Sequence, residues 1–142
     1  MKSLLLAGLC AITFLSVRPA SASEGHLRQG QAALASGLYL QALEQAGLAY
    51  EAGYQPDTAA FIMARAADLG RMAKGRTETL YLTALDHARN KAPVLGYLTV
   101  FYLQTGQTAK AEQSEAAFTA VCRYNCTGFR QHIRALKANR PH

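Results

Sequence analysis

Apolar and small residues recur along much of the chain at steps of three and four, which places them on one face of a helix. The pattern is clearest before Gly53, in a set that consists of Tyr39, Ala42, Leu43, Ala46, Ala49, Tyr50 and Gly53 itself. The stretch from Glu24 to Ser36 is also helical in pattern. Between the two, Gly37 can adopt the left-handed backbone that ends a helix. The segment therefore predicts two short helices folded against each other at Gly37.

The same alternation continues to the end of the chain and predicts five more helices and no strands. Their expected ranges are Thr58 to Lys74, Arg76 to Lys91, Val94 to Gln104, Gln107 to about Arg123, and Thr127 to Ala138. Gly75 is expected to end the first of them, and Pro56 to break the chain before Asp57 or Thr58 caps it. The run from Val94 is apolar enough for a strand, but its length, its start at Pro93 and its glycine end favour a helix.

Two of the expected turns share a pattern of a helix end, a glycine and an alanine five residues later. The pairs are Gly37 with Ala42 and Gly106 with Ala111. The two glycines stand 69 positions apart, close to two periods of about 34 residues. A pair of helices cannot bury both of its faces alone, so such units are expected to stack on one another.

With this period the chain resembles a tetratricopeptide-repeat protein, of the same general kind as the Sel1-like repeats. Gly30, Gly37, Tyr39, Ala42 and Ala49 match the repeat in its first copy, and Tyr102, Gly106 and Ala111 match it in the last. The chain departs from the repeat in having no tryptophan and a degenerate middle copy around Gly75. The resemblance implies an all-α fold, a right-handed α-solenoid of about three helix–turn–helix repeats plus a C-terminal capping helix. The expected units are 23–54, 57–91 and 92–123, followed by a basic cap at 127–139.

The resemblance also implies a binding groove lined by the first helix of each repeat. Carried across by the glycine alignment, the groove residues are Leu27, Gln31, Leu34, Arg65, Leu69, Met72, Val100, Leu103 and Gln104. Aliphatic and amide side chains suit peptide recognition, in which apolar anchors are oriented by hydrogen bonds. The alternative is that these residues only pack between hairpins.

Residues 1–22 have the pattern of a secretion signal. Lys2 is followed by an apolar run from Leu4 to Val17 that is too short for a comfortable membrane span, and Ala20-Ser21-Ala22 suits cleavage after Ala22. Cys10 allows a lipoprotein reading, which the large Leu9 before it disfavours. We expect a periplasmic or secreted protein, residues 23–142, with no transmembrane span once the signal is removed.

Only Cys122 and Cys126 would remain in the exported chain. An even number of cysteines in a secreted protein favours a disulfide, which here would tie the last helix to the third hairpin. Two alternatives stay open: free or redox-active thiols, and metal ligands together with His132.

The end of the chain is basic, with no acidic residue from Ala116 onward. Its cations are Arg123, Arg130, Arg134, Lys137 and Arg140. They form either a solvated cap or a patch that docks on acidic lipid, cell-wall polymer or an acidic partner. The whole chain carries a formal charge of +6, and the excess is too mild for a dedicated nucleic-acid binder.

No arrangement of residues predicts catalysis. Phosphate-binding loops, nucleophile elbows and haem-attachment motifs do not occur in the sequence, and its histidines are dispersed. Glu24, Glu44, Glu51 and Glu78 could serve as acids, but nothing distinguishes them from glutamates that face solvent. We therefore expect no cofactor and no enzyme activity. The expected function is protein–protein interaction or scaffolding in an envelope, secretion or pilus assembly. The alternatives are a small cell-wall-active enzyme or its regulator, and a metal- or redox-binding envelope protein.

Overall fold

The computed structural model describes residues 20–139, and this part of the chain contains seven helices and no strand. The helices are α1 (Ala20–Ala35), α2 (Tyr39–Glu51), α3 (Pro56–Leu69), α4 (Lys74–His87), α5 (Lys91–Gln104), α6 (Thr108–Val121) and α7 (Thr127–Ala138). The expectation of an all-α fold with seven helices is confirmed, including the helical form of the apolar run in α5. The predicted signal segment lies outside the described residues up to position 19.

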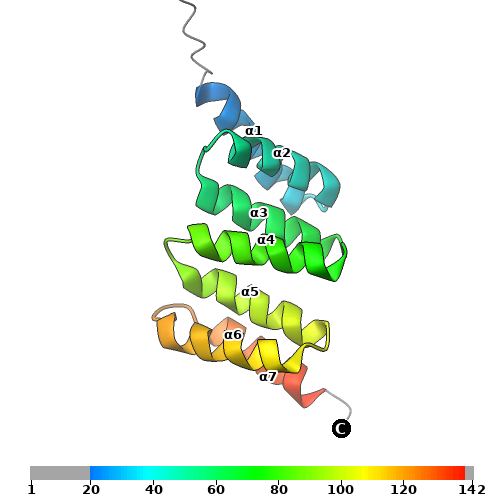
Figure 1. Ribbon diagram of the computed structural model, residues 1–142, viewed down its shortest axis with the longest axis vertical. Coiled ribbons are helices and arrows are strands. Elements are labelled where there is room, and N and C mark those ends of the chain that lie inside the picture. The colour runs from blue at the N-terminus through cyan, green and yellow to red at the C-terminus, as the bar shows by residue number, and fades with distance from the viewer. Residues whose placement is uncertain (1–19, 140–142) are drawn as a thin grey trace, which may run out of the picture.

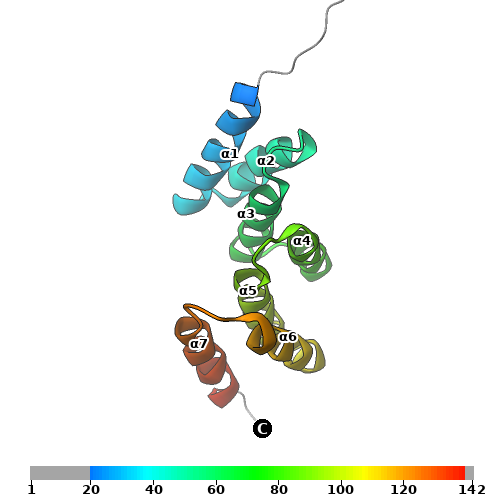
Figure 2. The same cartoon turned by 90° about the vertical axis from the view of Figure 1, so that its left-hand side faces the viewer.

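Consecutive helices pack against each other as three hairpins, α1–α2, α3–α4 and α5–α6, stacked in a row along the long axis of the molecule (Figure 1). The stack is solenoid-like, because each hairpin meets mainly its neighbours in sequence. Seen from the side, α1 and α7 lie on one face of the row and α4 and α6 on the other, with α3 and α5 between them (Figure 2). We call the face that carries α1 and α7 the inner face.

The three turns inside the hairpins are built alike. In each, two backbone N–H groups after the helix end donate to carbonyls three and five residues earlier, as Gly37 does to Leu34 and Leu38 does to Ala33. This pattern caps the last turn of a helix, and its first donor has a left-handed backbone. The left-handed residues are Gly37, Arg71 and Gly106, at intervals of 34 and 35 positions.

The expected middle turn at Gly75 is therefore wrong, because the turn lies at Arg71 and Gly75 belongs to the first turn of α4. Helix α3 ends at Leu69 rather than near Lys74, and both helices of this hairpin are shifted towards the N-terminus. The expected cap at Asp57 or Thr58 is also wrong. Helix α3 starts at Pro56, after Gln55 in a left-handed backbone, with no side-chain cap.

Small residues close both the first hairpin and its junction with the second. Ala42, Ala46 and Ala49 of α2 are fully buried. Gly30 of α1 lies so close to α2 that a β-carbon there would be 3.0 Å from the backbone nitrogen of Ala46. Small side chains thus allow the helix backbones to approach closely, as the sequence pattern predicts.

The third hairpin is buried differently, because α7 lies against α5. The Phe129 ring of α7 rests on Gly96 of α5, where a β-carbon would meet the ring at 2.6 Å. Ile133 is 1% exposed, and Phe129 also meets Phe118 of α6 edge-on, at 5.6 Å between ring centroids. Helix α7 packs much more extensively on α5 than on α6, so the cap turns onto the inner face instead of continuing the row.

Candidate functional site

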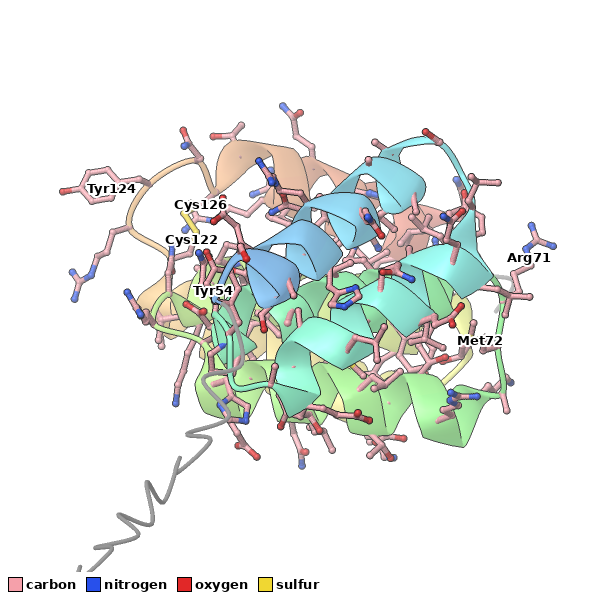
Figure 3. All side chains as sticks on the ribbon, turned by 90° about the horizontal axis from the view of Figure 1, so that it is seen from above. Tyr54, Arg71, Met72, Cys122, Tyr124 and Cys126 are labelled. Carbon is pink, nitrogen blue, oxygen red and sulfur yellow. A yellow bond between two sulfur atoms is a disulfide. The ribbon has the colours of Figure 1, made fainter. Side chains whose placement is uncertain are left out.

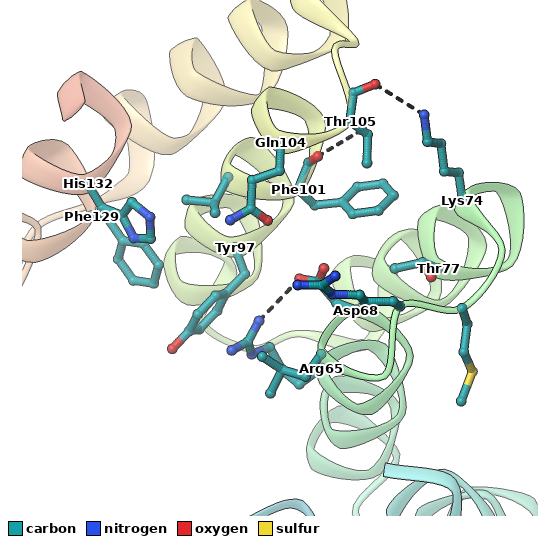
Figure 4. A pocket seen from close by; sticks show the side chains of 14 residues that line it. Arg65, Asp68, Lys74, Thr77, Tyr97, Phe101, Gln104, Thr105, Phe129 and His132 are labelled. Atoms are coloured by element: carbon teal, nitrogen blue, oxygen red, sulfur yellow. Dashed lines mark hydrogen bonds and ion pairs between the residues drawn. The ribbon is translucent and has the colours of Figure 1, made fainter. Parts of the chain in front are cut away.

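A pocket of about 670 Å³ lies at the junction between the second and third hairpins. We call it the junction pocket. Its walls come from α3, the α3–α4 turn, α4, α5 and α7 (Figure 4). The pocket exists because α4 and α5 pack much less extensively than α2 and α3, so the inner face opens between α3 and α5.

A fixed arginine forms one wall of the junction pocket. The Nη1 atom of Arg65 donates to Asp68 Oδ2 and to the Tyr81 hydroxyl oxygen, at 3.2 Å in each case. The Tyr81 hydroxyl in turn donates to the same carboxylate oxygen at 2.6 Å. The guanidinium also lies 3.8 Å from the centroid of the Tyr97 ring, in a cation–π arrangement. Arg65 is thus held in one orientation before any ligand arrives.

Burial makes this network expensive to break. Tyr81 is fully buried, and burial together with the nearby Asp68 carboxylate raises its pKa far above the ordinary tyrosine value. Tyr81 therefore stays protonated and continues to donate to Asp68 at any physiological pH. The side chains of Arg65 and Asp68 are only 17% and 14% exposed, so each is stabilised by the other in a poorly hydrated setting.

The rim of the pocket is positively charged. Arg71 and Lys74 are exposed at the α3–α4 turn, and the Lys74 ammonium approaches the Thr105 carbonyl oxygen at 3.5 Å, from one hairpin turn to the next. His132 lines the pocket from α7. Asp68 is the only acidic residue of the lining, and its Oδ2 atom is already engaged. The pocket therefore favours negative charge in a ligand.

Aromatic and aliphatic side chains complete the lining. Tyr97, Phe101 and Phe129 contribute rings, and Tyr97 meets Phe129 edge-on at 4.9 Å between centroids. Val100 and Met72 add aliphatic surface. The combination of apolar walls with a few oriented polar groups is typical of sites that bind side chains or small molecules.

Five of the nine residues expected in the groove line the junction pocket: Arg65, Leu69, Met72, Val100 and Gln104. The other four are placed elsewhere. Leu27 and Leu103 are 4% and 6% exposed and belong to the packed core, and Leu34 is half-buried between two core clusters. Gln31 is exposed on α1, away from the pocket lining.

Several lining residues were not expected from the sequence. Asp68 is three positions after Arg65, so helical spacing could have paired them. Tyr97 lies one position after the close approach at Gly96, and no local signal marks it. Phe129 and His132 depend on how α7 docks onto α5, which sequence periodicity does not determine.

Cys122 and Cys126 form a disulfide that closes the loop between α6 and α7. Tyr124, inside this loop, is 87% exposed and lies on the opposite edge of the molecule from Arg71 and Met72 (Figure 3). A bonded pair leaves no thiolate for metal binding in this state. The described residues contain no cluster of three or more potential metal ligands.

The basic residues of the tail are mostly free of acidic partners. Arg123, Arg130 and Arg134 are exposed and form no ion pair with the described residues. Lys137 pairs with Glu115 of α6 and so contributes to the docking of α7. Arg140 lies outside the described residues.

The four glutamates considered as candidate acids are either paired with a basic residue or exposed. Glu78 accepts from Lys110 at 2.6 Å and from the Tyr102 hydroxyl at 2.9 Å, and the hydrogen bond from Lys110 is the main reason that its pKa is lowered. General acids at neutral pH need the opposite shift. Glu24 pairs weakly with Arg28 at 3.9 Å, while Glu44 and Glu51 are exposed.

Comparison of the chain with protein-family models, curated proteins and solved structures found no match. Within residues 20–139, none of the helices has the length and apolar character needed to cross a membrane.

Proposed function

We propose that this protein is a binding module whose inner face receives a segment of another protein at the junction pocket. The observation that carries the proposal is the orientation of Arg65, held by Asp68, Tyr81 and Tyr97 on the wall of a 670 Å³ pocket. Pre-arranged polar groups among apolar walls reduce the entropic cost of binding. The site would engage side chains of the partner without changing shape.

The stacked hairpins support a tetratricopeptide-like assignment within this proposal. The three identical turns at intervals of 34 and 35 residues agree with the length of that repeat. Repeat proteins of this kind use a surface made by successive first helices, and here α3 and α5 supply half of the residues that line the pocket. The biological role would be scaffolding in an envelope, secretion or pilus assembly.

Export is the second part of the proposal. It is supported by the leader-like sequence of residues 1–22 and by a disulfide, which persists in oxidising compartments. Expression of the full chain in a bacterium, followed by fractionation and intact mass, tests it. A periplasmic or secreted product that begins at Ser23 and carries two fewer protons than the dithiol is expected. A full-length, reduced cytoplasmic product would contradict export.

A matched pair of variants tests the binding site. Leu69 is 43% exposed on the pocket lining, and Leu82 is 44% exposed on α4 outside that lining. Envelope extract is passed over the immobilised wild type, Leu69→Glu and Leu82→Glu proteins, and retained proteins are identified by mass spectrometry. The proposal expects partners retained by the wild type and Leu82→Glu but lost with Leu69→Glu. Equal retention by all three would place binding elsewhere and contradict the proposal.

A further inference from the structure

A second pocket of about 510 Å³ lies where the turn of the first hairpin meets the turn of the second. We call it the turn-edge pocket. It is lined mainly by apolar groups, among them Leu38, Leu40, Tyr39 and Met72. Leu38 and Leu40 are 54% and 76% exposed, more than the other exposed leucines Leu48, Leu69 and Leu82, which are 40–44% exposed.

The turn itself does not require these leucines. The other two hairpins form the same hydrogen-bonded turn with different residues at the matching positions. Where the first hairpin has Leu38 and Leu40, the third has Gln107 and Ala109. Exposed leucines confined to one of three equivalent turns are not explained by the fold, and neighbouring exposed apolar side chains are typical of a contact surface.

The two pockets adjoin each other along one edge of the stack. Met72 lines both of them, and it lies with Arg71 at the edge formed by the turns (Figure 3). The turns themselves are in close contact, since a β-carbon on Gly70 would lie 3.1 Å from the β-carbon of Tyr39. A linear segment could therefore pass from one pocket to the other without crossing a helix.

The two pockets differ in charge. The junction pocket has Arg71 and Lys74 at its rim and Arg65 on its wall, against the single engaged acid Asp68. No acidic or basic residue lines the turn-edge pocket. A complementary ligand carries an acidic group at one end and an aliphatic group at the other.

We infer that the partner is a linear peptide segment that runs along the turn edge, with an acidic side chain in the junction pocket and a leucine-like side chain in the turn-edge pocket. This inference rests on the proposed function and extends it to a second pocket. The pockets serve adjacent hairpin junctions, and helix axes in packed proteins are about 10 Å apart. An extended chain covers that kind of span, about 10–20 Å, in about 3 to 6 residues.

Selection of random 16-residue peptides displayed on phage, with the purified protein as target, tests the inference. The expected consensus has an aspartate or glutamate about 3 to 6 positions from a leucine, isoleucine or phenylalanine. The best peptide is then synthesised with a fluorescent label, and its Kd is measured by anisotropy for each variant. All substitutions are at exposed residues, and a circular dichroism melt checks that each variant folds.

Leu40→Ser and the pair Arg71→Gln with Lys74→Gln are each expected to raise the Kd about tenfold or more, a typical effect for loss of an anchor. Leu82→Ser, at a leucine outside both pockets, is expected to leave it unchanged within about twofold. Replacing the acidic residue of the peptide by its amide should weaken binding to the wild type but hardly to the arginine–lysine double variant.

The outcomes separate the inference from the proposed function. Peptides that lose affinity with Leu69→Glu but bind Leu40→Ser as tightly as the wild type would overturn the inference and retain the junction pocket. A consensus without an acidic residue would also overturn it. Failure to enrich any peptide, or binding unaffected by Leu69→Glu, would overturn both.

Discussion

The junction between the first and second hairpins and the junction between the second and third use the same repeat positions with different residues. Ala46 of α2 and Tyr81 of α4 occupy equivalent positions of the repeat, 35 residues apart. Ala66 of α3 and Phe101 of α5 are related in the same way. The alanines are fully buried where α2 and α3 pack closely. The rings of Tyr81 and Phe101 lie 5.8 Å apart between centroids, where α4 and α5 pack less closely and the junction pocket opens.

The difference shows how one helical repeat architecture can produce both a closely packed junction and a pocket. Alanines bring two helices together along their length, and their packing leaves little free space. Aromatic residues hold the next pair further apart, and the Tyr81 hydroxyl group bonds to Arg65 and Asp68, which allows these polar side chains to be partly buried.

Tyr81→Ala should have the largest effect, because it removes a fully buried ring and leaves Asp68 without its shortest hydrogen bond. We expect a loss of about 3–5 kcal/mol in the free energy of unfolding, measured by urea denaturation. Tyr81→Phe is the matched control, since it keeps the ring and should lose about 1–3 kcal/mol. Equal losses for the two variants would show that the ring does not support the junction.

Ala46→Leu adds volume to the close joint and should destabilise the protein by about 1–3 kcal/mol. Ala116 of α6 is exposed and provides the control, because Ala116→Leu has the same chemistry without a packed neighbour. Its effect should be within about 0.5 kcal/mol. If both substitutions are tolerated equally, the close approach of α2 and α3 is not set by the small residues.

Gly96→Ala should loosen α7, because the new methyl group would occupy the place of the Phe129 ring. We expect the free energy of unfolding to fall by about 1–3 kcal/mol. Hydrogen exchange in residues 127–138 should become faster than in the wild type, with little change in the other helices. Gly75→Ala is the control, since nothing lies within 4 Å of a β-carbon there. Unchanged exchange in α7 would contradict the docking role of Gly96.

Arg71→Gly should stabilise the protein by about 1 kcal/mol, because Arg71 has a φ of 52° in the one of the three intra-hairpin turns that lacks a left-handed glycine. The larger backbone entropy of glycine in the unfolded chain offsets part of the gain. Arg71→Ala keeps a β-carbon and should not stabilise. A decrease in stability with glycine would mean that the arginine side chain makes a compensating contact.

The smallest expected effect is a pH dependence from Glu78. Its folded pKa lies below the unfolded value, so its ion pair with Lys110 stabilises the fold at neutral pH and is lost as the pH falls below about 4.5 and through the folded pKa. Urea denaturation of the wild type and Glu78→Gln between pH 3 and 7 measures this contribution. The two curves should differ most near pH 7 and converge in acid. A constant difference would argue against the ion pair.

The sequence determines the helices better than the turns. Helix α7 is found with the bounds that its periodicity predicts, because Phe129, Ile133 and Leu136 form an isolated apolar stripe. The middle turn was misplaced because a left-handed residue suggests glycine, and here arginine takes that conformation while Gly75 lies inside a helix. Local propensity could not decide this, since the repeat period fixes the turn through tertiary packing.

The sequence could group pocket residues only where they lie on the same helix. Arg65, Leu69 and Met72 share the inner side of α3 and the turn after it, so their spacing was enough to group them. Leu103 was assigned to the groove by the same helical spacing, but it belongs to the core because α5 is buried on several sides. The stacking of Tyr97 on Arg65 joins two hairpins, and such a contact is set by the separation of α3 and α5.

The position of α7 limits how much of the inner face is open for contact with another molecule. By folding back over α5, this helix occupies the inner side of the third hairpin, where a longer repeat array would offer fresh surface. On the proposed function, the positions left for a partner lie mainly at the junction between the second and third hairpins, which suits a short sequence motif. A C-terminal affinity tag would follow this same helix, so a tag inserted directly before Ser23, after the expected cleavage point, is the safer choice for interaction assays.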